Sequence, residues 1–351
     1  EVKMIIVSYD ISDDKLRTNF AKYLSEFLTV YMVNERGFSH NTIKSYRDTF
    51  VQFISYISEH KNIKIDRFDF PMITQNMVIE FLDWLEKERK CSIQTRNNRL
   101  AAIHSFIKYV QYQYPDNLYE FQRILSIRNK KHTKGKINYL TIEGISLLLS
   151  MPNKHSINGR RDLALLSLMY DIGARVQEMA DLKVEDVHLD KPFYINVCGK
   201  GNKIRTVPMT ESQLNVLSVY MKENRLTEKT WRPYPLFMNN RKEKLTRGGI
   251  TYILKKYVTM ARKVNPDIIP EIVSCHSLRH SKAMHLLQAG VNLVYIRDIL
   301  GHVSIQTTEV YARADSKQKR EAIQKAYKNV APDVEPLWEK DKDLLQWLKS
   351  F

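Results

Sequence analysis

The stretch from Cys275 to Ala312 constrains the fold of this chain more than any other. Its apolar residues recur at helical spacing before Gly290 and again after it, which predicts two helices separated by a break at the glycine. His276 and Arg279 are one turn apart at the start of the first helix, so both side chains can face the same way. A helix start that combines backbone N–H groups with arginine and histidine side chains suits a phosphate.

Three more residues extend this pattern toward the C-terminal end of the stretch. His280 follows Arg279 directly, His302 comes after the second expected helix, and Tyr311 lies nine residues further on. We expect a short helix from Ser304 to Glu309 to direct the phenol of Tyr311 toward the same phosphate.

A zinc site is the alternative interpretation of His276 and His280, which are spaced i, i+4 beside Cys275. Such a site needs a third ligand or a glutamate inside the motif, and the sequence provides neither. A nuclease with two metal ions would need a cluster of carboxylates, which is not evident either. We therefore expect no metal and no cofactor, and we interpret His280 as a residue that supports the site or faces the phosphate.

The net charge of the chain indicates a polyanionic partner. The 351 residues include 55 Lys and Arg against 39 Asp and Glu, a formal net charge of +16. Such a charge attracts nucleic acid or, alternatively, an anionic membrane surface. No apolar run reaches the roughly 18 residues of a membrane span, and the apolar MIIV near the start is too short for a signal peptide. We therefore expect a nucleic-acid partner and no membrane association.

The length of the chain favours two domains over one. The three cysteines, Cys91, Cys198 and Cys275, are far apart and form no C-x-x-C pair, which is typical of a protein from a reducing cytoplasm. The chain begins with Glu1 rather than methionine, so we expect that trimming has removed residues before it.

The first domain is predicted to be helical and to span residues 15–122. Residues 1–14 show no clear period and are left unassigned. Four segments with apolar residues at helical spacing begin near Lys15, Ser39, Thr74 and Ser92. Four helices joined by short loops predict a compact all-α domain.

Two of these helix starts carry amides, hydroxyls and basic side chains, the groups that contact phosphates and base edges in DNA. For either cluster alone, an ordinary solvated helix face is an equally good interpretation. Two such clusters in one basic chain favour DNA. The residues expected to contact DNA here are His40, Asn41, Thr42, Lys44, Arg47, Thr95, Arg96, Asn98 and Arg99.

A basic linker is predicted over residues 123–137. Between Phe121 and Lys136 the sequence has six basic residues and no acid. Such a segment can span two domains and lie along a phosphate backbone, with Lys130, Lys131 and Lys134 as expected contacts. An ordinary solvated linker is the alternative, and the absence of acids makes it less favoured.

The second domain is predicted to span residues 138–330 and to be mainly helical with one β-hairpin. Alternating residues in 193–197 and 204–208 flank the turn GKGN and predict that hairpin. Helices are expected over 141–150, 161–170, 211–223, 246–263 and 316–329, with a short one starting at Arg175. The helix over 246–263 has a basic face, on which Arg247 is a further expected DNA contact.

The last segment, residues 331–351, is predicted to form a tail helix. Pro332 and Pro336 break the preceding helix, and Leu344, Trp347 and Leu348 then recur at helical spacing. From the sequence alone, this apolar stripe can pack on its own domain or on another subunit.

Five sequence elements together resemble the tyrosine recombinases, the phage-integrase family. They are GARVQE at 173–178, GKGNK at 199–203, HSLRH at 276–280, LGH at 300–302, and Tyr311, in the family's order over roughly 140 residues. The segments SHNTIKSYRDTF and TRNNRLAAIHSFIKY are similar, more loosely, to the family's N-terminal core-binding domain. The ending TTEVYARADSKQKREAIQKAY looks most like the transposon-encoded branch.

The resemblance implies a fold and a function. The fold is mainly α with a small β-hairpin or sheet: an N-terminal helical core-binding domain and a C-terminal mixed α/β catalytic domain. The function is site-specific recombination of double-stranded DNA through a 3′-phosphotyrosyl intermediate and a Holliday junction, here moving a mobile element. It also implies a homo-tetramer, a tail that docks on a neighbouring subunit, a possible accessory directionality or bending factor, and a bacterial cytoplasmic location associated with the nucleoid.

Each residue of the pattern has a chemical role in such a reaction. Tyr311 is the expected nucleophile, and because the ordinary pKa of tyrosine is about 10 it needs activation. Arg175 and Arg279 can each hold two phosphate oxygens, and His302 can donate one more hydrogen bond. His276 is expected to position the phosphate and to accept the tyrosine proton.

Two further roles leave alternatives open. Lys200, at the tip of the hairpin, is the expected donor of a proton to the leaving 5′-oxygen, with Lys203 and Arg205 as alternatives. Glu178 lies three residues after Arg175 and is expected to brace its guanidinium, although it can equally be a surface carboxylate.

Three other functions remain open on this sequence. A DNA-binding or architectural protein that does not cleave DNA would share the basic faces but would not need the arginine, lysine and tyrosine motifs together. A type IB topoisomerase would cleave in a similar way but rejoin the same strand. A chromosome-dimer-resolving enzyme of the Xer kind would share the whole reaction.

Overall fold

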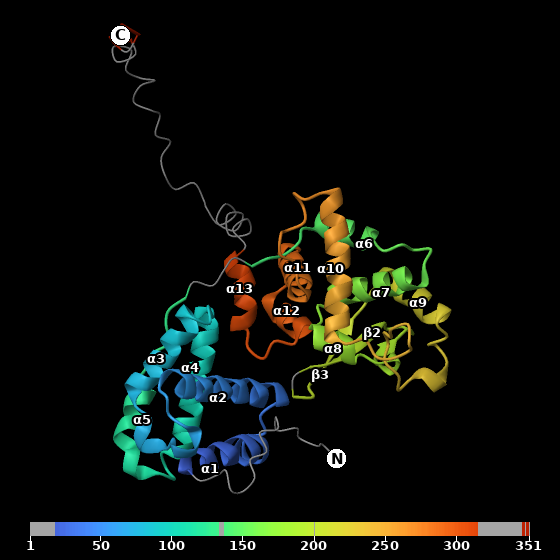
Figure 1. The fold of residues 1–351 in the computed structure, drawn as a ribbon. Helices are drawn as coiled ribbons and strands as arrows, with labels where there is room; N and C mark the ends of the chain where they lie inside the picture. The colour runs from blue at the N-terminus through green and yellow to red at the C-terminus, as the bar shows by residue number, and fades with distance from the viewer. Residues whose placement is uncertain (1–17, 133–136, 200, 315–345, 348, 351) are drawn as a thin grey trace. The chain divides into compact units, whose positions relative to one another are not determined.

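The computed structural model describes residues 18–132, 137–199, 201–314, 346–347 and 349–350. The chain divides into two compact units, Glu1–Lys134 and Gly135–Phe351, and each is described by itself (Figure 1). The expected helix over 316–329, residues 1–14, Lys134, Lys200 and most of the tail from 331 onward lie outside the described residues. Within the described ranges, no helix combines the length and apolar character needed to cross a membrane.

The first unit is a bundle of helices with short connections. Its elements are α1 (Asn19–Glu26), continued by the π-helix η2 (Phe27–Glu35), then α2 (His40–His60), η3 (Ile65–Arg67), η4 (Phe70–Met72), α3 (Gln75–Lys87), α4 (Ile93–Val110), η5 (Pro115–Asn117) and α5 (Leu118–Leu125). The side chains of Ser39, Thr74 and Ser92 each accept a hydrogen bond from a backbone N–H in the first turn of the following helix. These caps confirm the three predicted helix starts.

Aromatic side chains form the centre of this unit. The ring of Phe106 on α4 contacts those of Phe20, Phe27 and Phe50, with centroids 5.7, 5.3 and 5.1 Å apart and the rings edge to face. This packing joins α1, η2, α2 and α4 around one core.

A fifth helix, α5, was not expected. It is only eight residues long, too short to show several turns of apolar periodicity, yet it places Phe121 and Ile124 fully in the core. Arg123, assigned to the linker from sequence, lies on α5 and forms an ion pair with Glu120 at 2.6 Å. The helical body therefore continues beyond residue 122, and the two units separate after Lys134.

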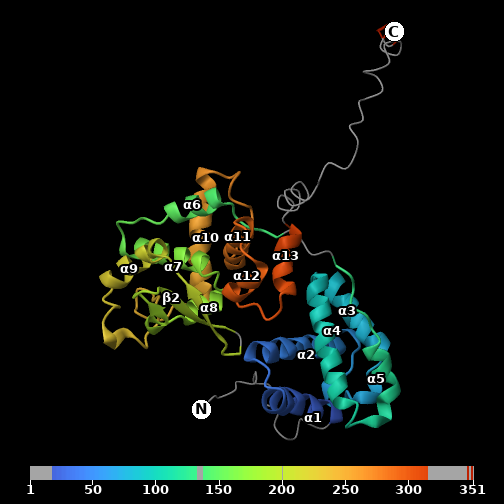
Figure 2. The ribbon, with the colours of Figure 1, turned by 180° about the vertical axis from the view of Figure 1, so that it is seen from behind.

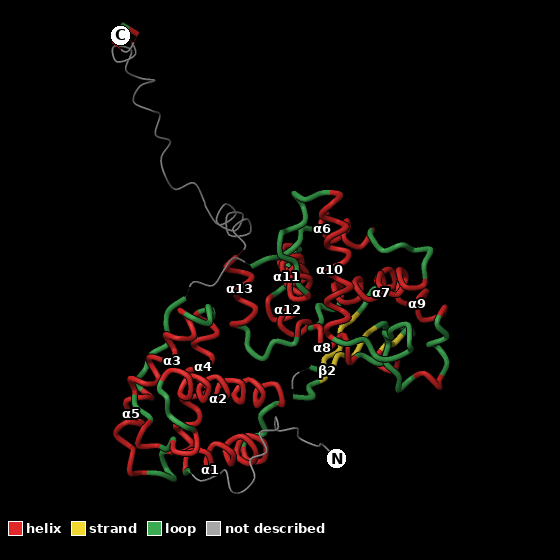
Figure 3. Tube along the Cα trace, in the orientation of Figure 1, coloured by secondary structure: helices red, strands yellow, loops and turns green. Residues whose placement is uncertain are grey.

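The second unit combines helices with a small antiparallel sheet (Figure 3). Its elements are α6 (Ile142–Ser150), α7 (Ile157–Asp171), α8 (Val176–Asp181), η6 (Val184–Asp186), β1 (Val187–His188), β2 (Tyr194–Cys198), β3 (Ile204–Pro208), α9 (Glu211–Glu223), η7 (Lys229–Trp231), α10 (Arg247–Val264), α11 (Cys275–Gln288), α12 (Leu293–Leu300) and α13 (Gln306–Ala314). Strands β2 and β3 form the predicted hairpin, with Tyr194 opposite Pro208 and Cys198 opposite Ile204. The two-residue strand β1, which was not predicted, pairs with β2 and completes the order β1-β2-β3. The sheet lies near α7, α8 and α9 (Figure 3).

Helices α11, α12 and α13 lie side by side, as the two opposite views show (Figures 1 and 2). They share a separate apolar cluster that includes Met284, Ile296, Leu300 and Tyr311. Gly290, with φ +82°, turns the chain between α11 and α12 as predicted. The expected helix over 304–309 that ends before Tyr311 is wrong: α13 continues to Ala314 and carries Tyr311 within it, because that side chain packs into the cluster.

Candidate active site

Arg279 links three elements from a buried position. The N-cap side chain of Ser274 starts α11, and Arg279 in its second turn is 3 % exposed. Its Nη1 donates to the carbonyl oxygen of Gly173 at 2.6 Å, and its Nη2 donates to that of Leu300 at 2.5 Å. Burial and the neighbouring charge of Arg175 lower the pKa of Arg279 to about 10, so the guanidinium stays charged at neutral pH.

The backbone at Gly173 is shaped for this contact. Gly173 has φ +56°, and a Cβ atom there would lie 2.6 Å from Cδ2 of Leu300. A side chain at this position would therefore strain the backbone and displace the Leu300 side chain, so glycine suits the turn that follows α7 beside α12.

Arg175 is held by Glu178 from the same turn of chain. Arg175 is the N-cap of α8; its backbone N–H donates to Oε2 of Glu178 at 2.9 Å, and its Nη1 donates to Oε1 at 2.7 Å. The side chain of Glu178 is 5 % exposed, whereas that of Arg175 is 36 % exposed. Glu178 is thus a buried brace rather than a surface carboxylate, and Arg175 keeps an accessible edge.

Arg205 on β3 is a second partner of Glu178. Its Nη2 donates to Oε2 of Glu178 at 2.7 Å, and its Nε donates to the carbonyl oxygen of Ile299 at 2.8 Å. Burial raises the pKa of Glu178, but the hydrogen bonds and charge of Arg205, with the hydrogen bonds from Arg175, outweigh it and lower that pKa overall. Because arginine keeps its proton in proteins, this buried residue is unsuited to be the alternative proton donor.

The sequence contained a signal for the place of Arg205. In a strand of period two, Arg205 shares a face with Val207, which is buried. Lys203, the other alternative to Lys200, is exposed, and Lys200 itself lies outside the described residues.

Tyr311 is enclosed by two histidines. Its side chain is 3 % exposed, and its hydroxyl forms a 2.9 Å hydrogen bond with Nδ1 of His280. The ring of His302 stacks on it with centroids 6.4 Å apart, and Nδ1 of His302 bonds Oγ1 of Thr308 at 2.9 Å. Burial raises the pKa of Tyr311, while the charges of Arg279 and Arg175 act in the opposite direction.

The phenol therefore contacts His280, to which the sequence assigned only a supporting role. His276, the expected proton acceptor, is exposed, and its ring centroid lies 6.1 Å from that of His280. Burial and the nearby positive charges lower the pKa of all three histidines, that of His302 to about 4. All three rings are thus neutral at neutral pH.

Within the described residues, these contacts place two guanidinium groups on one buried carboxylate, with the charge of a third, that of Arg279, near enough to interact with it. Arg175, Arg205 and Arg279 together with Glu178 leave an excess of positive charge beside the phenol. Such an excess can be neutralised by a phosphate diester and its developing transition-state charge. No group of three or more metal-ligating side chains occurs within the described ranges.

The polar helix starts of the first unit are arranged differently. His40, Asn41 and Lys44 on α2 are exposed, as is Asn98 on α4. The hydroxyls of Thr42 and Thr95 bond the capping serines at 2.9 and 3.0 Å.

The arginines expected to contact DNA in this unit have partners within it. Arg96 is 4 % exposed, and its Nε lies 2.9 Å from Oε1 of Glu86. Arg99 donates from Nη1 to the carbonyl oxygen of Ser45 at 2.8 Å, which ties α4 to α2. Arg47 forms an ion pair with Asp48 at 3.1 Å. Arg96 in particular is enclosed by its own unit, so the expectation that it contacts DNA does not agree with the structure.

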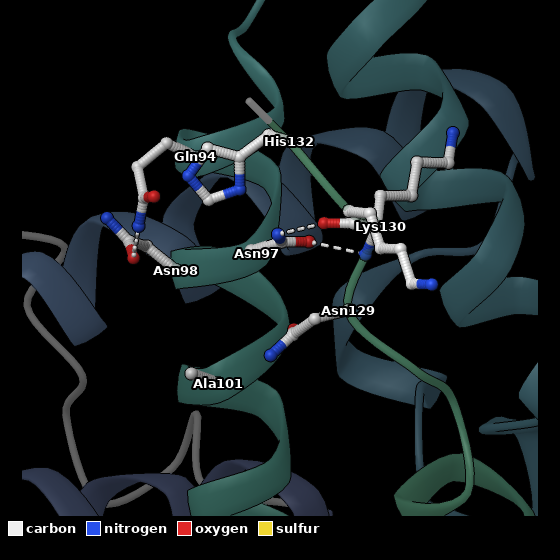
Figure 4. A pocket seen from close by; sticks show the side chains of 8 residues that line it. Gln94, Asn97, Asn98, Ala101, Asn129, Lys130 and His132 are labelled. Atoms are coloured by element: carbon white, nitrogen blue, oxygen red, sulfur yellow. Dashed lines mark hydrogen bonds between the residues drawn. The ribbon is translucent and has the colours of Figure 1, made fainter. Parts of the chain in front are cut away.

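A polar hollow lies beside the start of α4 (Figure 4). The side-chain amide of Asn97 donates to the backbone carbonyl of Lys130 at 2.9 Å and accepts from its N–H at 3.1 Å, which fixes this part of the chain against α4. Gln94 donates to Asn98 at 3.0 Å. The hollow is lined by Gln94, Asn97, Asn98, Ala101, Asn129, Lys130, Lys131 and His132.

Arg247, the expected DNA contact in the second unit, is the first residue of α10 and is exposed.

Two domain families, both of phage integrases, match separate parts of the sequence. Residues 138–318 match the Phage integrase family, and residues 24–114 match the N-terminal SAM-like domain of phage integrases. The chain belongs to the phage integrase family of tyrosine recombinases. The expected fold, a helical N-terminal domain and a mixed catalytic domain, is confirmed.

Individual relatives agree with this class. The chain is 34 % identical over 335 residues to a putative integrase/recombinase y4rC of Sinorhizobium fredii, covering 95 % of this chain and 98 % of that one. It is 31 % identical over 283 residues to the tyrosine recombinase XerD of Listeria monocytogenes, covering 80 % and 90 %. The protein is a site-specific DNA recombinase of the tyrosine class.

Solved structures share the fold. The XerH site-specific recombinase in a post-cleavage complex superposes with a TM-score of 0.64 at 22 % identity, covering 80 % of this chain and 79 % of that one. The Tn1549 transposon integrase superposes with a TM-score of 0.65 at 17 % identity, covering 85 % and 98 %.

Proposed function

We propose that the protein cleaves and rejoins double-stranded DNA with Tyr311 as the nucleophile. The phenol oxygen bonds to the scissile phosphorus, the bond from phosphorus to the 5′-oxygen breaks, and a 3′-phosphotyrosyl link remains. The freed 5′-hydroxyl then attacks the phosphorus of the phosphotyrosyl link in the partner duplex, the bond from that phosphorus to the phenol oxygen breaks, and the tyrosine is released. The phosphodiester energy is retained in the covalent link, so no cofactor is needed.

One observation carries this proposal. Arg175 is held by Glu178, and Arg279 by the carbonyls of Gly173 and Leu300, close to a tyrosine that both charges influence. Preorganised donors of this kind stabilise charge that develops on nonbridging oxygens. His302 contributes a further hydrogen bond, and Lys200 supplies a proton to the leaving 5′-oxygen.

Two histidines are candidates for taking the tyrosine proton. His276 is the candidate from sequence, and its exposure suits a residue that also contacts the phosphate. His280 is the candidate from structure, because its Nδ1 contacts the phenol oxygen. Both rings are neutral at neutral pH, as a base must be.

The DNA partner, the assembly and the biological role are inferred from the charge of the chain and from its relatives. The net charge of +16 and the exposed polar residues of α2, α4 and α10 support binding of a DNA duplex by both units. We propose exchange within a homo-tetramer through a Holliday junction, in the bacterial cytoplasm and at the nucleoid, with an accessory factor directing it. The integrase-named relative supports movement of a mobile element, and the XerD relative supports resolution of chromosome dimers as the second candidate.

The decisive experiment captures the covalent intermediate. The protein is incubated with a pool of nicked duplexes of randomised sequence in EDTA, and the DNA that stays attached after denaturation is sequenced. We expect wild-type protein to give an adduct on selected sequences and Tyr311→Phe to give none. Binding without an adduct would identify a DNA-binding protein that does not cleave.

The selected duplex then separates the enzymatic alternatives. Placed twice in one plasmid, it should give exchange between the two copies and a four-way junction intermediate. Relaxation of supercoils without exchange would instead indicate a topoisomerase of type IB.

A further inference from the structure

Arg205 joins the hairpin to two other elements of the site. It lies on β3, two residues beyond the GKGNK turn, and its side chain is 10 % exposed. One edge of the guanidinium donates to Glu178 on α8 and Nε donates to Ile299 at the end of α12. The three elements are far apart in sequence: Arg205 is 27 residues from Glu178 and 94 from Ile299.

Two glycines lie beside this guanidinium, and at one of them, Gly301, a side chain would be crowded by it. A Cβ atom at Gly301 would lie 2.9 Å from Cδ of Arg205, closer than real Cβ atoms come, and 3.0 Å from its Nη1, which is a tight contact. A Cβ atom at Gly199 would lie 3.5 Å from Oε1 of Glu178 and 3.7 Å from Nη1 of Arg205. The glycine next to His302 and the glycine at the base of the hairpin therefore both border Arg205.

The contacts of Arg205 close a ring around the site. Glu178 links Arg175 to Arg205, Arg205 bonds the carbonyl of Ile299, and Arg279 bonds the next carbonyl, that of Leu300. Arg279 also bonds Gly173, two residues before Arg175. Two adjacent carbonyls at the C-terminal end of α12 thus receive one arginine each, a favourable place for positive charge.

We propose that Arg205 is a positioning residue for strand cleavage: through Glu178 it orients Arg175, and through the end of α12 it places the Gly301–His302 corner. The proposal rests on the proposed function, in which Arg175 and His302 contact the scissile phosphate. Removal of Arg205 leaves one oxygen of a buried carboxylate without its cation and one terminal carbonyl of α12 without its donor, so both elements can shift. Lysine keeps the charge but lacks the planar fork that reaches both acceptors.

The test compares Arg205→Met and Arg205→Lys with Arg161→Met, using the duplex recovered by covalent capture. Arg161 is a matched control: it is 13 % exposed and forms an ion pair at 2.7 Å with the buried Asp162, outside the ring of contacts described above. Each protein is given two duplexes, one with the natural scissile phosphate and one with a neutral methylphosphonate there. The neutral group places less negative charge in the transition state and depends less on a correctly aligned arginine.

We expect Arg205→Met to slow adduct formation about 100-fold on the phosphate, the size of effect that a misplacement of about 1 Å produces. On the methylphosphonate the deficit should shrink to about tenfold or less, in parallel with Arg175→Ala, because charge stabilisation contributes less there. Arg205→Lys should be intermediate on the phosphate. Arg161→Met should change both substrates by the same factor.

A second readout is independent of cleavage. The positive charge of Arg205 is one of those that lower the pKa of His302, after burial and the charges of Arg279 and Arg175. The protein is isotope-labelled at histidine and titrated by NMR, and the signal of His302 is assigned by its loss in His302→Gln. Its titration midpoint should move to higher pH in Arg205→Met and stay unchanged in Arg161→Met.

Four outcomes decide the matter. An equal deficit of Arg205→Met on both duplexes, or a rate within about twofold of wild type, would overturn the positioning role. Should Arg205→Met fail to fold, Arg205→Lys is judged by the same ratio between substrates. An unchanged His302 titration in a folded Arg205 variant also counts against the proposal. No adduct from the wild-type protein would overturn the proposed function, and the role of Arg205 in cleavage with it.

Discussion

The two units of the molecule differ in which of their basic and polar side chains stay accessible. In the catalytic unit, Arg175 and Arg279 are fixed by buried partners while Arg175 keeps an accessible edge. In the first unit, Arg96 and Arg99 are engaged by the unit itself, and the exposed groups among the expected DNA contacts of α2 and α4 are His40, Asn41, Lys44 and Asn98. A reaction centre needs donors held to within a fraction of an ångström, whereas binding along a duplex tolerates mobile side chains. We therefore expect few, large effects in one unit and many, small effects in the other.

The largest effect is expected from Arg279→Ala. The substitution removes a guanidinium that bonds both Gly173 and Leu300, so phosphate binding and the geometry of the site are lost together. We expect single-turnover adduct formation to fall about 1,000-fold or more, as for loss of a preorganised oxyanion donor. Arg160→Ala, which removes a partly exposed arginine paired with Glu223, is the control and should cleave normally. If Arg279→Ala had only a small effect, cleavage would not depend on a few arginines that buried partners hold in place.

Glu178→Gln should have the next largest effect. The carboxylate holds two arginines, and its neutral substitute can hold neither as strongly. We expect a loss of about 3 kcal/mol in the free energy of unfolding, the cost of breaking a buried ion pair, measured by urea denaturation. Cleavage should slow as well. Glu185→Gln removes a carboxylate from a half-exposed pair with Lys183 and should change the free energy of unfolding by about 0.5 kcal/mol or less. If both variants lost the same stability, the burial of Glu178 between two arginines would not be what stabilises this unit.

His280→Asn distinguishes the two candidates for the proton acceptor. If His280 takes the proton from Tyr311, the variant should cleave about 100-fold more slowly. The pKa of this ring lies below the ordinary value of 6.5, and in wild-type protein the cleavage rate should fall as the pH drops through that lowered pKa. The variant should not show this fall in rate at acidic pH. His276→Asn is the comparison. If only His276→Asn removes the acid limb, the proton acceptor is the residue expected from the sequence.

The stability of the catalytic unit should depend on pH through His302. Burial and three arginines lower its pKa from 6.5 to about 4, so between these values the unfolded chain binds a proton that the folded protein does not. Stability contributed by this residue is complete above pH 6.5 and is lost as pH falls toward 4, at most about 1.4 kcal/mol per pKa unit. His302→Gln should flatten the decline in thermal unfolding measurements, whereas His155→Gln, at an exposed position, should not.

The smallest effects are expected in the first unit. Asn98→Ala removes an exposed amide that, with Gln94, borders the polar hollow on α4. We expect binding of the selected duplex to weaken by about 1 kcal/mol, with cleavage of bound DNA unchanged, because a single amide of this kind contributes modestly to the reading of base edges. Arg96→Ala should instead lower stability, since that side chain is buried against Glu86. Loss of affinity from Arg96→Ala without loss of stability would show that this arginine reaches DNA after all.

Local patterns predicted the elements well. The caps at Ser39, Thr74 and Ser92, the hairpin around GKGN, and the break at Gly290 all depend on neighbouring residues, and all are present in the structure. The failures have two causes, the shortness of an element and packing against distant residues. The eight residues of α5 and the two residues of β1 are too short to show a period, and α13 extends through Tyr311 because distant packing holds it.

What the sequence by itself determined is the set of chemical groups and their order: the arginine, lysine, histidine and tyrosine motifs, and the helices and strands on which they lie. Only the tertiary structure decided which groups meet. Arg205 and Ile299 are 94 residues apart, Arg279 and Gly173 are 106 apart, and His280 and Tyr311 are 31 apart. Local periodicity has no information about such pairs, because it reports which face of an element is buried and not what covers that face. The same limit explains why Arg96, on a polar stretch of sequence, turned inward to Glu86.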